Sequence, residues 1–391
     1  MNIRNLFLNH VAQTSEEPMG FEVSKAEGVF LYDEKGKQYI DFIAGISVCS
    51  VGHSHPKIIA AIKEQSEKYL HTMVYGEHVQ SPQVLFAKAL CDLLPAKINS
   101  CYFTNSGSEA TEGAIKLAKR VTGKQKIASI KNSYHGSTAG ALSLMSDEYF
   151  TNAFRPLVPG TIFLDYNNIE SIERIDDCTA AVVVELVKAE TGCTIANKDF
   201  IQALAQKCKK LGALLIVDEI QTAIGRTGSS FAFEDYGIEP DVILLAKSLG
   251  GGLPLGAFLA NQKHMSQLSH NPVLGHITTF GGNPLCCVAG HAALDALLDG
   301  KYISDVHKKE KLIKKLLVHD KIKAVHGKGL LLAVELENAE TTTAAMRKCI
   351  ANGLITDWFL FAPNMLRIAP PLIMDEKTIK EACDLLLQSL D

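Results

Sequence analysis

The feature that most constrains this chain begins near residue 98, where short apolar runs alternate with stretches of helical spacing. Each run carries apolar residues at successive positions, so both faces of the resulting strand are expected to be buried. Intervening helices, expected over 108–120 and 199–211, would cover those faces. The pattern predicts an α/β fold with a mainly parallel sheet, built from strands at 100–104, 126–130, 179–186, 213–219, 241–246 and 256–260.

The flanking segments predict a smaller companion domain. Residues 29–43 read as a hairpin that turns at Lys35–Gly36, and residues after about 290 read as helices around apolar runs at 325–336 and 365–369. Residues 1–45 are expected to pack with this small α+β domain over 286–391, and 46–285 to form the large cofactor-binding domain. An amphipathic helix is expected over 55–71, with one apolar side made of Ile58, Ile59, Ile62, Tyr69 and Leu70.

Charge and cysteine usage exclude several classes of protein. The 391 residues carry a formal net charge of −4 with both signs mixed, so no basic field for nucleic acid or a membrane surface is expected. No C-x-x-C pair occurs among the ten cysteines, which indicates free thiols and no metal site. The N-terminus lacks a hydrophobic signal core and no apolar run is long enough for a bilayer, so we expect a cytoplasmic location.

Polar residues follow two of the expected strands. Residues 105–109, Asn-Ser-Gly-Ser-Glu, open a helix after the strand at 100–104, and free N–H groups at such a helix start can hold a phosphate. Tyr134 follows the strand at 126–130 and can stack on a flat ring. Each feature has an ordinary alternative, a helix cap in the first case and a core aromatic in the second.

Two charged residues end the next strands. Asp218 follows a buried apolar run, and Lys247 ends the strand at 241–246 before three glycines. A buried carboxylate needs a partner such as a pyridinium N–H, and desolvation favours the neutral amine of a lysine. The alternatives are a helix N-cap acid and a snorkelling lysine. Ligands of open α/β sheets bind beyond the carboxyl ends of the strands, so together these residues predict a site for pyridoxal 5′-phosphate (PLP).

Over nearly its whole length the chain resembles the class III aminotransferases of PLP fold type I, particularly the acetylornithine and ornithine aminotransferases. No G-x-G-x-x-G or P-loop motif supports a nucleotide enzyme instead. The resemblance lies in GISVCSVGHSHP (45–56), NSGSEATEGAIKLAKR (105–120), NSYHGST (132–138), LLIVDEIQTAIGRTG (214–228), LLAKSLGGGLPLGA (244–257), TTFGGNP (278–284) and MLRIAPPL (365–372).

The resemblance implies a role for each residue around the cofactor ring. Lys247 would hold PLP as a Schiff base, and Asp218 would contact the ring nitrogen. Tyr134 and Ile220 would sandwich the ring, while Gln221 would contact the ring hydroxyl oxygen.

The resemblance also implies a homodimer with shared active sites. Gly107 and Ser108 would hold the cofactor phosphate, and Thr279 would reach the phosphate of the partner subunit's cofactor.

The resemblance assigns four residues to the substrate. Arg367 would grip a carboxylate, which suits its planar fork of donors. Glu190 would pair with Arg367 and move aside, so that an ω-amine and a 2-oxo acid are both accepted. Glu185 would lie near the amine-bearing end, and Thr278 near the substrate.

Two departures affect the substrate but not the cofactor. Ser137 replaces an arginine that helps to bind the substrate carboxylate in acetylornithine and ornithine enzymes. The usual E-P-I-Q-G-E becomes ELVKAE over 185–190, which brings in Lys188. Lys188 either points into the cleft and supplies the missing charge, or is an ordinary solvated lysine.

These observations predict a PLP-dependent aminotransferase that moves the terminal amine of a donor such as N-acetylornithine to a 2-oxo acid, 2-oxoglutarate. Ornithine, lysine, 4-aminobutyrate and diamines are alternative donors. A decarboxylase or aminomutase of the same fold, and a catalytically idle PLP-binding module, are the competing functions.

Overall fold

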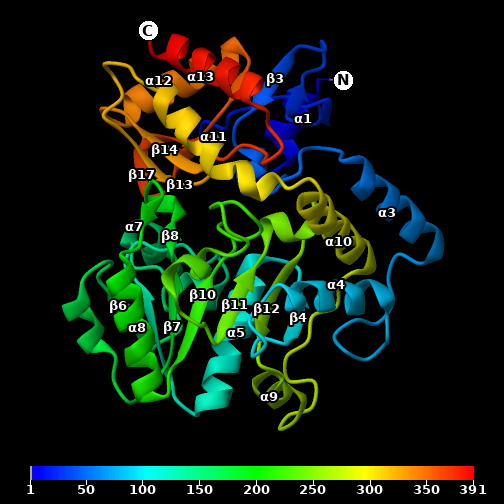
Figure 1. The fold of residues 1–391 in the computed structure, drawn as a ribbon, viewed down its shortest axis with the longest axis vertical. Helices are drawn as coiled ribbons and strands as arrows, with labels where there is room; N and C mark the ends of the chain where they lie inside the picture. Colours follow the sequence, from blue (N-terminus) through cyan, green and yellow to red (C-terminus); the bar gives the residue numbers. More distant parts are fainter. Residues whose placement is uncertain (1) are drawn as a thin grey trace.

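The large sheet has the strand order β4-β12-β11-β10-β7-β5-β6 in the computed structural model, which describes residues 2–391 (Figure 1). Four neighbouring pairs, from β11 through β10, β7 and β5 to β6, are parallel, whereas β12 is antiparallel to both β11 and β4. The prediction of a mainly parallel α/β sheet is confirmed. The strands are β4 Ser100–Thr104, β5 Lys126–Ile130, β6 Thr161–Leu164, β7 Thr179–Glu185, β10 Leu214–Asp218, β11 Val242–Leu245 and β12 Gly256–Ala260.

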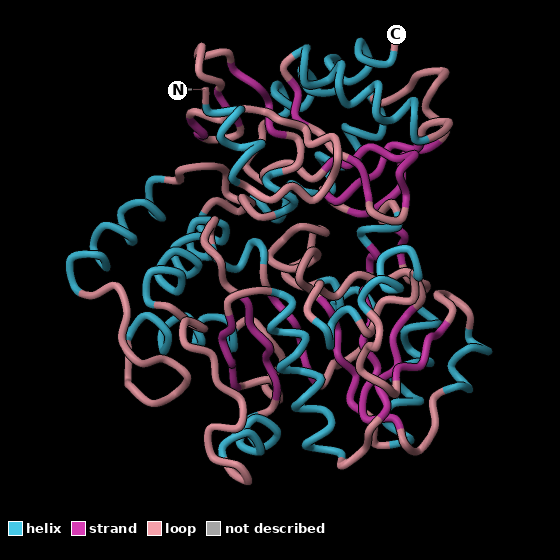
Figure 2. Tube along the Cα trace, turned by 180° about the vertical axis from the view of Figure 1, so that it is seen from behind, coloured by secondary structure: helices cyan, strands magenta, loops and turns pink. Residues whose placement is uncertain are grey.

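Both faces of this sheet are buried because successive side chains alternate between two apolar clusters. Leu215 and Val217 of β10 pack in the cluster that includes helix α8 (Lys198–Leu211). Leu214 and Ile216 of the same strand pack in the cluster that includes helix α5 (Gly107–Thr122). Figure 2, seen from behind, shows α5 running across the strands. Strands that are apolar on both faces therefore need helices on both sides, as the sequence pattern predicts.

The two ends of the chain build the smaller part of the molecule together (Figure 1). The predicted hairpin forms with Phe30 opposite Ile40, and β3 also pairs with β15 in parallel. One sheet has the order β1-β2-β3-β15 and another, antiparallel, the order β13-β14-β17-β16. These strands are β1 Lys25–Glu27, β2 Phe30–Tyr32, β3 Gln38–Asp41, β13 Ala324–Lys328, β14 Leu331–Glu335, β15 Leu354–Ile355, β16 Trp358–Phe359 and β17 Ala362–Ile368; β8 Val187–Lys188 and β9 Thr194–Ile195 form a separate ribbon.

The helix expected over 55–71 is α3 (Pro56–Lys68), and its predicted apolar side is only partly correct. Ile58 is buried, but Ile59 and Leu70 are 38% and 59% exposed. The other α-helices are α1 Ile3–His10, α2 Ala44–Ser47, α4 Ser81–Asp92, α6 Ala139–Leu142, α7 Glu148–Thr151, α9 Gln262–Met265, α10 Pro284–Asp299, α11 Tyr302–Leu316, α12 Ala339–Asn352 and α13 Glu376–Leu390. The domain boundaries at 45 and 285 stay a prediction.

A buried arginine joins the large part of the molecule to the small part. Arg226, in the loop after β10, donates to the Leu330 carbonyl oxygen at 3.0 Å and to Ser50 Oγ at 3.2 Å. These bonds hold the loop that precedes β14 against the edge of the large sheet. Within residues 2–391 no helix is both long and apolar enough to cross a membrane.

Candidate active site

A cavity of about 520 Å³ lies at the carboxyl edge of the large sheet, beyond the ends of β4, β5, β7, β10 and β11. Because these strands point the same way, residues far apart in the sequence meet there. The site residues predicted from the sequence that line this cavity are Gly107, Ser108, Tyr134, Glu185, Asp218, Ile220, Gln221 and Lys247.

The start of helix α5 forms one wall and suits an anion. Ser106 caps the helix by accepting a hydrogen bond from the Glu109 amide at 3.2 Å. The amides of Gly107 and Ser108 have no acceptor among the described residues, so both N–H groups are free at the positive end of the helix dipole. Such a helix start can hold a phosphate group.

A glycine allows a second loop to approach this helix start. Gly136 has a φ of +126°, and a Cβ atom there would lie 2.2 Å from Ser108 Oγ. The next amide, of Ser137, donates to the same Ser108 hydroxyl at 3.2 Å. The side chain of Ser108 is therefore fixed by backbone that only glycine allows to come so close.

A buried histidine holds the carboxylate of Asp218. Asp218 ends β10, and its Oδ2 lies 2.7 Å from His135 Nδ1, while its Oδ1 accepts from the Ile220 amide at 2.9 Å. Burial lowers the pKa of His135, but the hydrogen bond and charge of Asp218 outweigh it, so this pKa is raised. Tyr134 and Ile220 line the same cavity, where an aromatic and an aliphatic side chain can enclose a flat ring.

Lys247 lies two residues after β11, in a left-handed conformation with a φ of +51°. A positive φ is uncommon for lysine and often marks a functional position. Burial lowers the pKa of its amine, and the attraction of Glu190 and other nearby acids only partly opposes this shift. Lys247 is therefore a lining amine that is readily made neutral and nucleophilic.

Arg367 lies outside the cavity lining and reaches it through Gln221. Glu190 accepts from both terminal nitrogens of Arg367, each at 3.0 Å. Asp357 accepts from its Nε at 2.9 Å, and Gln221 Oε1 accepts from Nη1 at 3.2 Å. Burial raises the pKa of Glu190, but the charge of Arg367 outweighs burial and lowers this pKa overall. Arg367 and Glu190 therefore form a buried, ionised pair joined by two hydrogen bonds.

Lys188 corrects one interpretation of the sequence. It is only 6% exposed, and its Nζ donates to the Lys131 carbonyl oxygen at 2.7 Å and lies over the Tyr166 ring. The solvated interpretation is therefore wrong, and the side chain does not line the cavity either. Burial lowers the pKa of Lys188 and raises that of Glu185, which accepts from the Tyr134 amide at 3.3 Å.

The two predicted threonines lie away from the cavity lining of this chain. Thr278 Oγ1 accepts from Asn105 Nδ2 at 2.7 Å, and Asn105 lines the cavity. Thr279 is exposed and lies outside the lining. The structure thus connects Thr278 to the cavity through Asn105 and leaves Thr279 facing outward.

Sequence reasoning did not assign functional roles to His135, Asn105 or Asp357. His135 follows the predicted stacking residue, and the need of a buried carboxylate for a partner is the signal that could have identified it. Asp357 lies in a short connection between β15 and β16, and nothing in its sequence neighbourhood indicates that it contacts Arg367.

The residues at this edge fit PLP in chemical type. The free amides of Gly107 and Ser108 suit its phosphate, and Asp218 keeps lone pairs for a ring N–H. Lys247 supplies an amine for its aldehyde.

Comparison with known proteins identifies the group to which this arrangement belongs. The family described as aminotransferase class-III matches residues 11–390. An acetylornithine aminotransferase from Archaeoglobus fulgidus is 37% identical over 93% of this chain and 94% of its own. Another, from Methanocaldococcus jannaschii, is 38% identical over 94% of this chain and 92% of its own.

Solved structures have the same fold. An ornithine aminotransferase from Toxoplasma gondii matches with a TM-score of 0.91 and 28% identity, over 99% of this chain and 94% of that one. An acetylornithine aminotransferase from Elizabethkingia anophelis matches with a TM-score of 0.87 and 32% identity, over 99% and 98%. A second structure of the Toxoplasma enzyme is described with PLP in partial occupancy at its active site.

Gly136→Ala is expected to weaken PLP binding, because the added methyl group would overlap Ser108 at the start of helix α5, where the phosphate would bind. Equilibrium dialysis should show the dissociation constant for PLP rising by about tenfold or more, which corresponds to about 1.4 kcal/mol. Gly212→Ala is the matched control, since Gly212 also has a positive φ but its Cβ would meet no atom within 4 Å. Unchanged PLP affinity in Gly136→Ala would show that the start of helix α5 does not hold the phosphate as proposed.

Proposed function

Because this chain belongs to the class-III aminotransferase family, we propose that it moves the terminal amine of a donor such as N-acetylornithine to 2-oxoglutarate. Its cofactor is PLP, which when bound accepts the amino group and draws electrons from the donor carbon. The choice of N-acetylornithine is supported by relatives described as acetylornithine aminotransferases. Transamination is supported by the amine of Lys247 and the carboxylate of Asp218 in the cavity lining.

The closed pair of Glu190 and Arg367 carries this proposal. An aminotransferase must bind two unlike substrates in turn at one site. While Glu190 holds Arg367, the cation is neutralised, so an uncharged part of an amine donor is tolerated beside it. When Glu190 moves aside, the guanidinium offers two parallel N–H groups to the carboxylate of a 2-oxo acid.

The remaining residues have separate tasks in this proposal. Lys247 would attach the cofactor through its amine, and its free amine would move a proton from the donor carbon. Asp218, oriented by His135, would contact the ring nitrogen. Tyr134 and Ile220, which line the cavity, would enclose the ring, and Gln221, which accepts from Arg367, would contact its hydroxyl oxygen.

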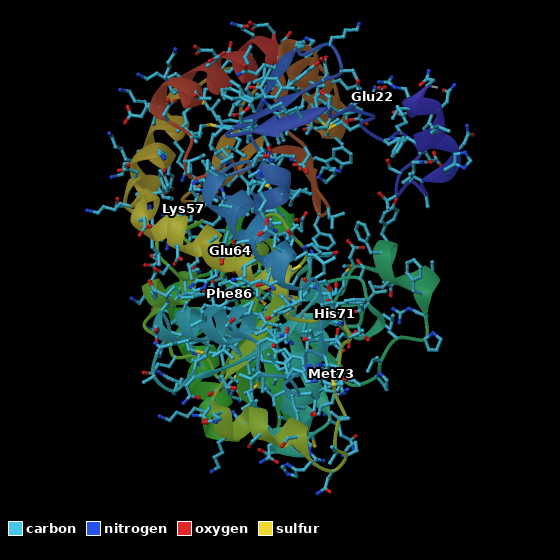
Figure 3. All side chains as sticks on the ribbon, turned by 90° about the vertical axis from the view of Figure 1, so that its right-hand side faces the viewer. Glu22, Lys57, Glu64, His71, Met73 and Phe86 are labelled. Atoms are coloured by element: carbon cyan, nitrogen blue, oxygen red, sulfur yellow. The ribbon has the colours of Figure 1, made fainter. Side chains whose placement is uncertain are left out.

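We also propose that two copies of this chain complete each other's sites. Segments 70–85 and 273–283 lie together, since the rings of His71 and Phe280 are 4.9 Å apart and Asn283 Nδ2 donates to the Leu70 carbonyl oxygen at 3.1 Å. Figure 3 faces this surface and labels His71 and Met73. Large apolar patches mark protein interfaces, and Thr279 lies within this one. Its exposed members are Leu70, Met73, Val79, Val84, Leu85, Val273, Leu274, Ile277 and Phe280.

The test of the function is spectroscopic. N-acetylornithine added without an oxo acid should bleach the visible band of the purified holoenzyme, and 2-oxoglutarate added afterwards should restore it. Lys247→Ala should lose turnover by several orders of magnitude, because both the attachment point and the proton carrier are removed. Near-normal turnover in that variant would contradict the assignment, and bleaching by another amine alone would change the donor.

Glu190→Gln should separate the two half-reactions. The neutral amide holds Arg367 less strongly, so the KM for 2-oxoglutarate should fall by several-fold. The donor half-reaction should slow by about tenfold, because the buried guanidinium loses its countercharge beside the uncharged part of the donor. Glu17→Gln, which disrupts the exposed pair with Arg347, is the control. Equal losses in both half-reactions would mean that Glu190 acts only structurally.

A further inference from the structure

We propose that the donor site of this chain does not recognise a carboxylate on the donor, so that primary amines with a neutral or cationic far end are equally good substrates. The inference rests on the proposed function and specifies its donor class. Monoacylated and free diamines belong to this class.

The charges on the cavity wall support this inference. Among the described lining residues, Lys247 is the only lysine or arginine, and its amine is committed to the cofactor. The lining acids are Glu185 and Asp218, both buried. His135, the other charged side chain of the lining, is paired with Asp218 at 2.7 Å, and burial raises the pKa of Glu185 to about 7. A donor carboxylate would therefore lose its hydration at a wall that offers no unpaired cation.

Nearby cations outside the lining are already engaged. All five N–H groups of Arg367 have acceptors, on Glu190, Asp357, Gln221 and the Trp358 carbonyl. In the proposed function Glu190 moves aside only for the oxo acid, so these acceptors stay in place in the donor half-reaction. Arg367 is therefore not free for the donor.

Lys131 and Lys188 lie three residues along the chain from the lining residues Tyr134 and Glu185, but their ammonium groups do not enter the cavity lining. Lys188 donates to the carbonyl oxygen of Lys131 at 2.7 Å and lies over the Tyr166 ring. Lys131 itself pairs with Asp165 at 2.6 Å. Neither ammonium group lines the cavity.

The corner of the site beside Tyr134 carries two hydroxyl groups and no unpaired cation among the described lining residues. Ser137 Oγ lies 3.1 Å from the Tyr134 hydroxyl, and Ser137 is exposed next to the lining residue Gly136. Neutral hydroxyls can bond to an amide, an alcohol or an ammonium group without requiring a charge. They give a carboxylate far less than an arginine fork does.

A matched pair of donors tests the inference. N-acetylornithine and N-acetylputrescine differ only in the carboxylate, and each is added to the holoenzyme without an oxo acid while the visible band is followed. The second-order rate constants should agree within about tenfold, or favour N-acetylputrescine, because a desolvated charge-assisted contact would alter them by on the order of 10- to 100-fold. A preference above tenfold for N-acetylornithine would overturn the inference, whether the cation comes from this chain or its partner.

Ser137→Arg should create the missing recognition. An arginine at this exposed position lies beside Tyr134, so the preference for N-acetylornithine over N-acetylputrescine should rise by tenfold or more. Ser137→Gln, which adds length without charge, is the control and should leave the ratio within about threefold of wild type. If the ratio of the two rate constants is unchanged in Ser137→Arg, position 137 does not face the far end of the donor, and the inference would fail.

Failure of the proposed function gives a different result. If neither amine bleaches the band, calorimetry of both with the PLP-loaded Lys247→Ala variant still compares their binding. Equal affinities would support the inference although the donor is another amine. Binding of N-acetylornithine that is more than tenfold tighter would overturn it.

Discussion

The cost of burying charge governs the architecture of this site. Asp218, Glu190 and Arg367 are each at most 6% exposed, and an ion in such surroundings persists only with a partner. His135 supplies that partner for Asp218, while Glu190 and Asp357 supply it for Arg367. Lys247 has no such close partner, and burial lowers its pKa accordingly. In the proposed function the paired charges bind and orient, and the unpaired amine of Lys247 reacts.

The pairings also join the parts of the molecule. Arg367 lies on β17 of the small part, whereas Glu190 and Gln221 belong to loops of the large sheet. Arg226 adds a second connection through Leu330 and Ser50. Movement of Glu190 away from Arg367 would remove a contact between the two parts. In the proposed function, substrate exchange would therefore change a contact between these parts.

The sequence predicted the large sheet well because its strands are apolar on both faces. β4, β5 and β12 have the bounds that their apolar runs predict. The edge strand β6 was missed, since three of its four residues are only half-buried and its apolar pattern is weak. The burial of Lys188 was not predicted, because no local sequence pattern indicates its contacts with the Lys131 carbonyl oxygen and the Tyr166 ring. The contact between Arg367 and Glu190 was expected only by resemblance, since no local pattern pairs residues so far apart.

The central claim is that Lys247 is the lysine that holds the cofactor. The direct measurement is reduction of the PLP-loaded protein with borohydride, followed by digestion and mass spectrometry of the peptides. We expect one reduced pyridoxyl group, on the peptide that contains Lys247. The label on another lysine, such as Lys188, or no label after addition of PLP, would contradict it.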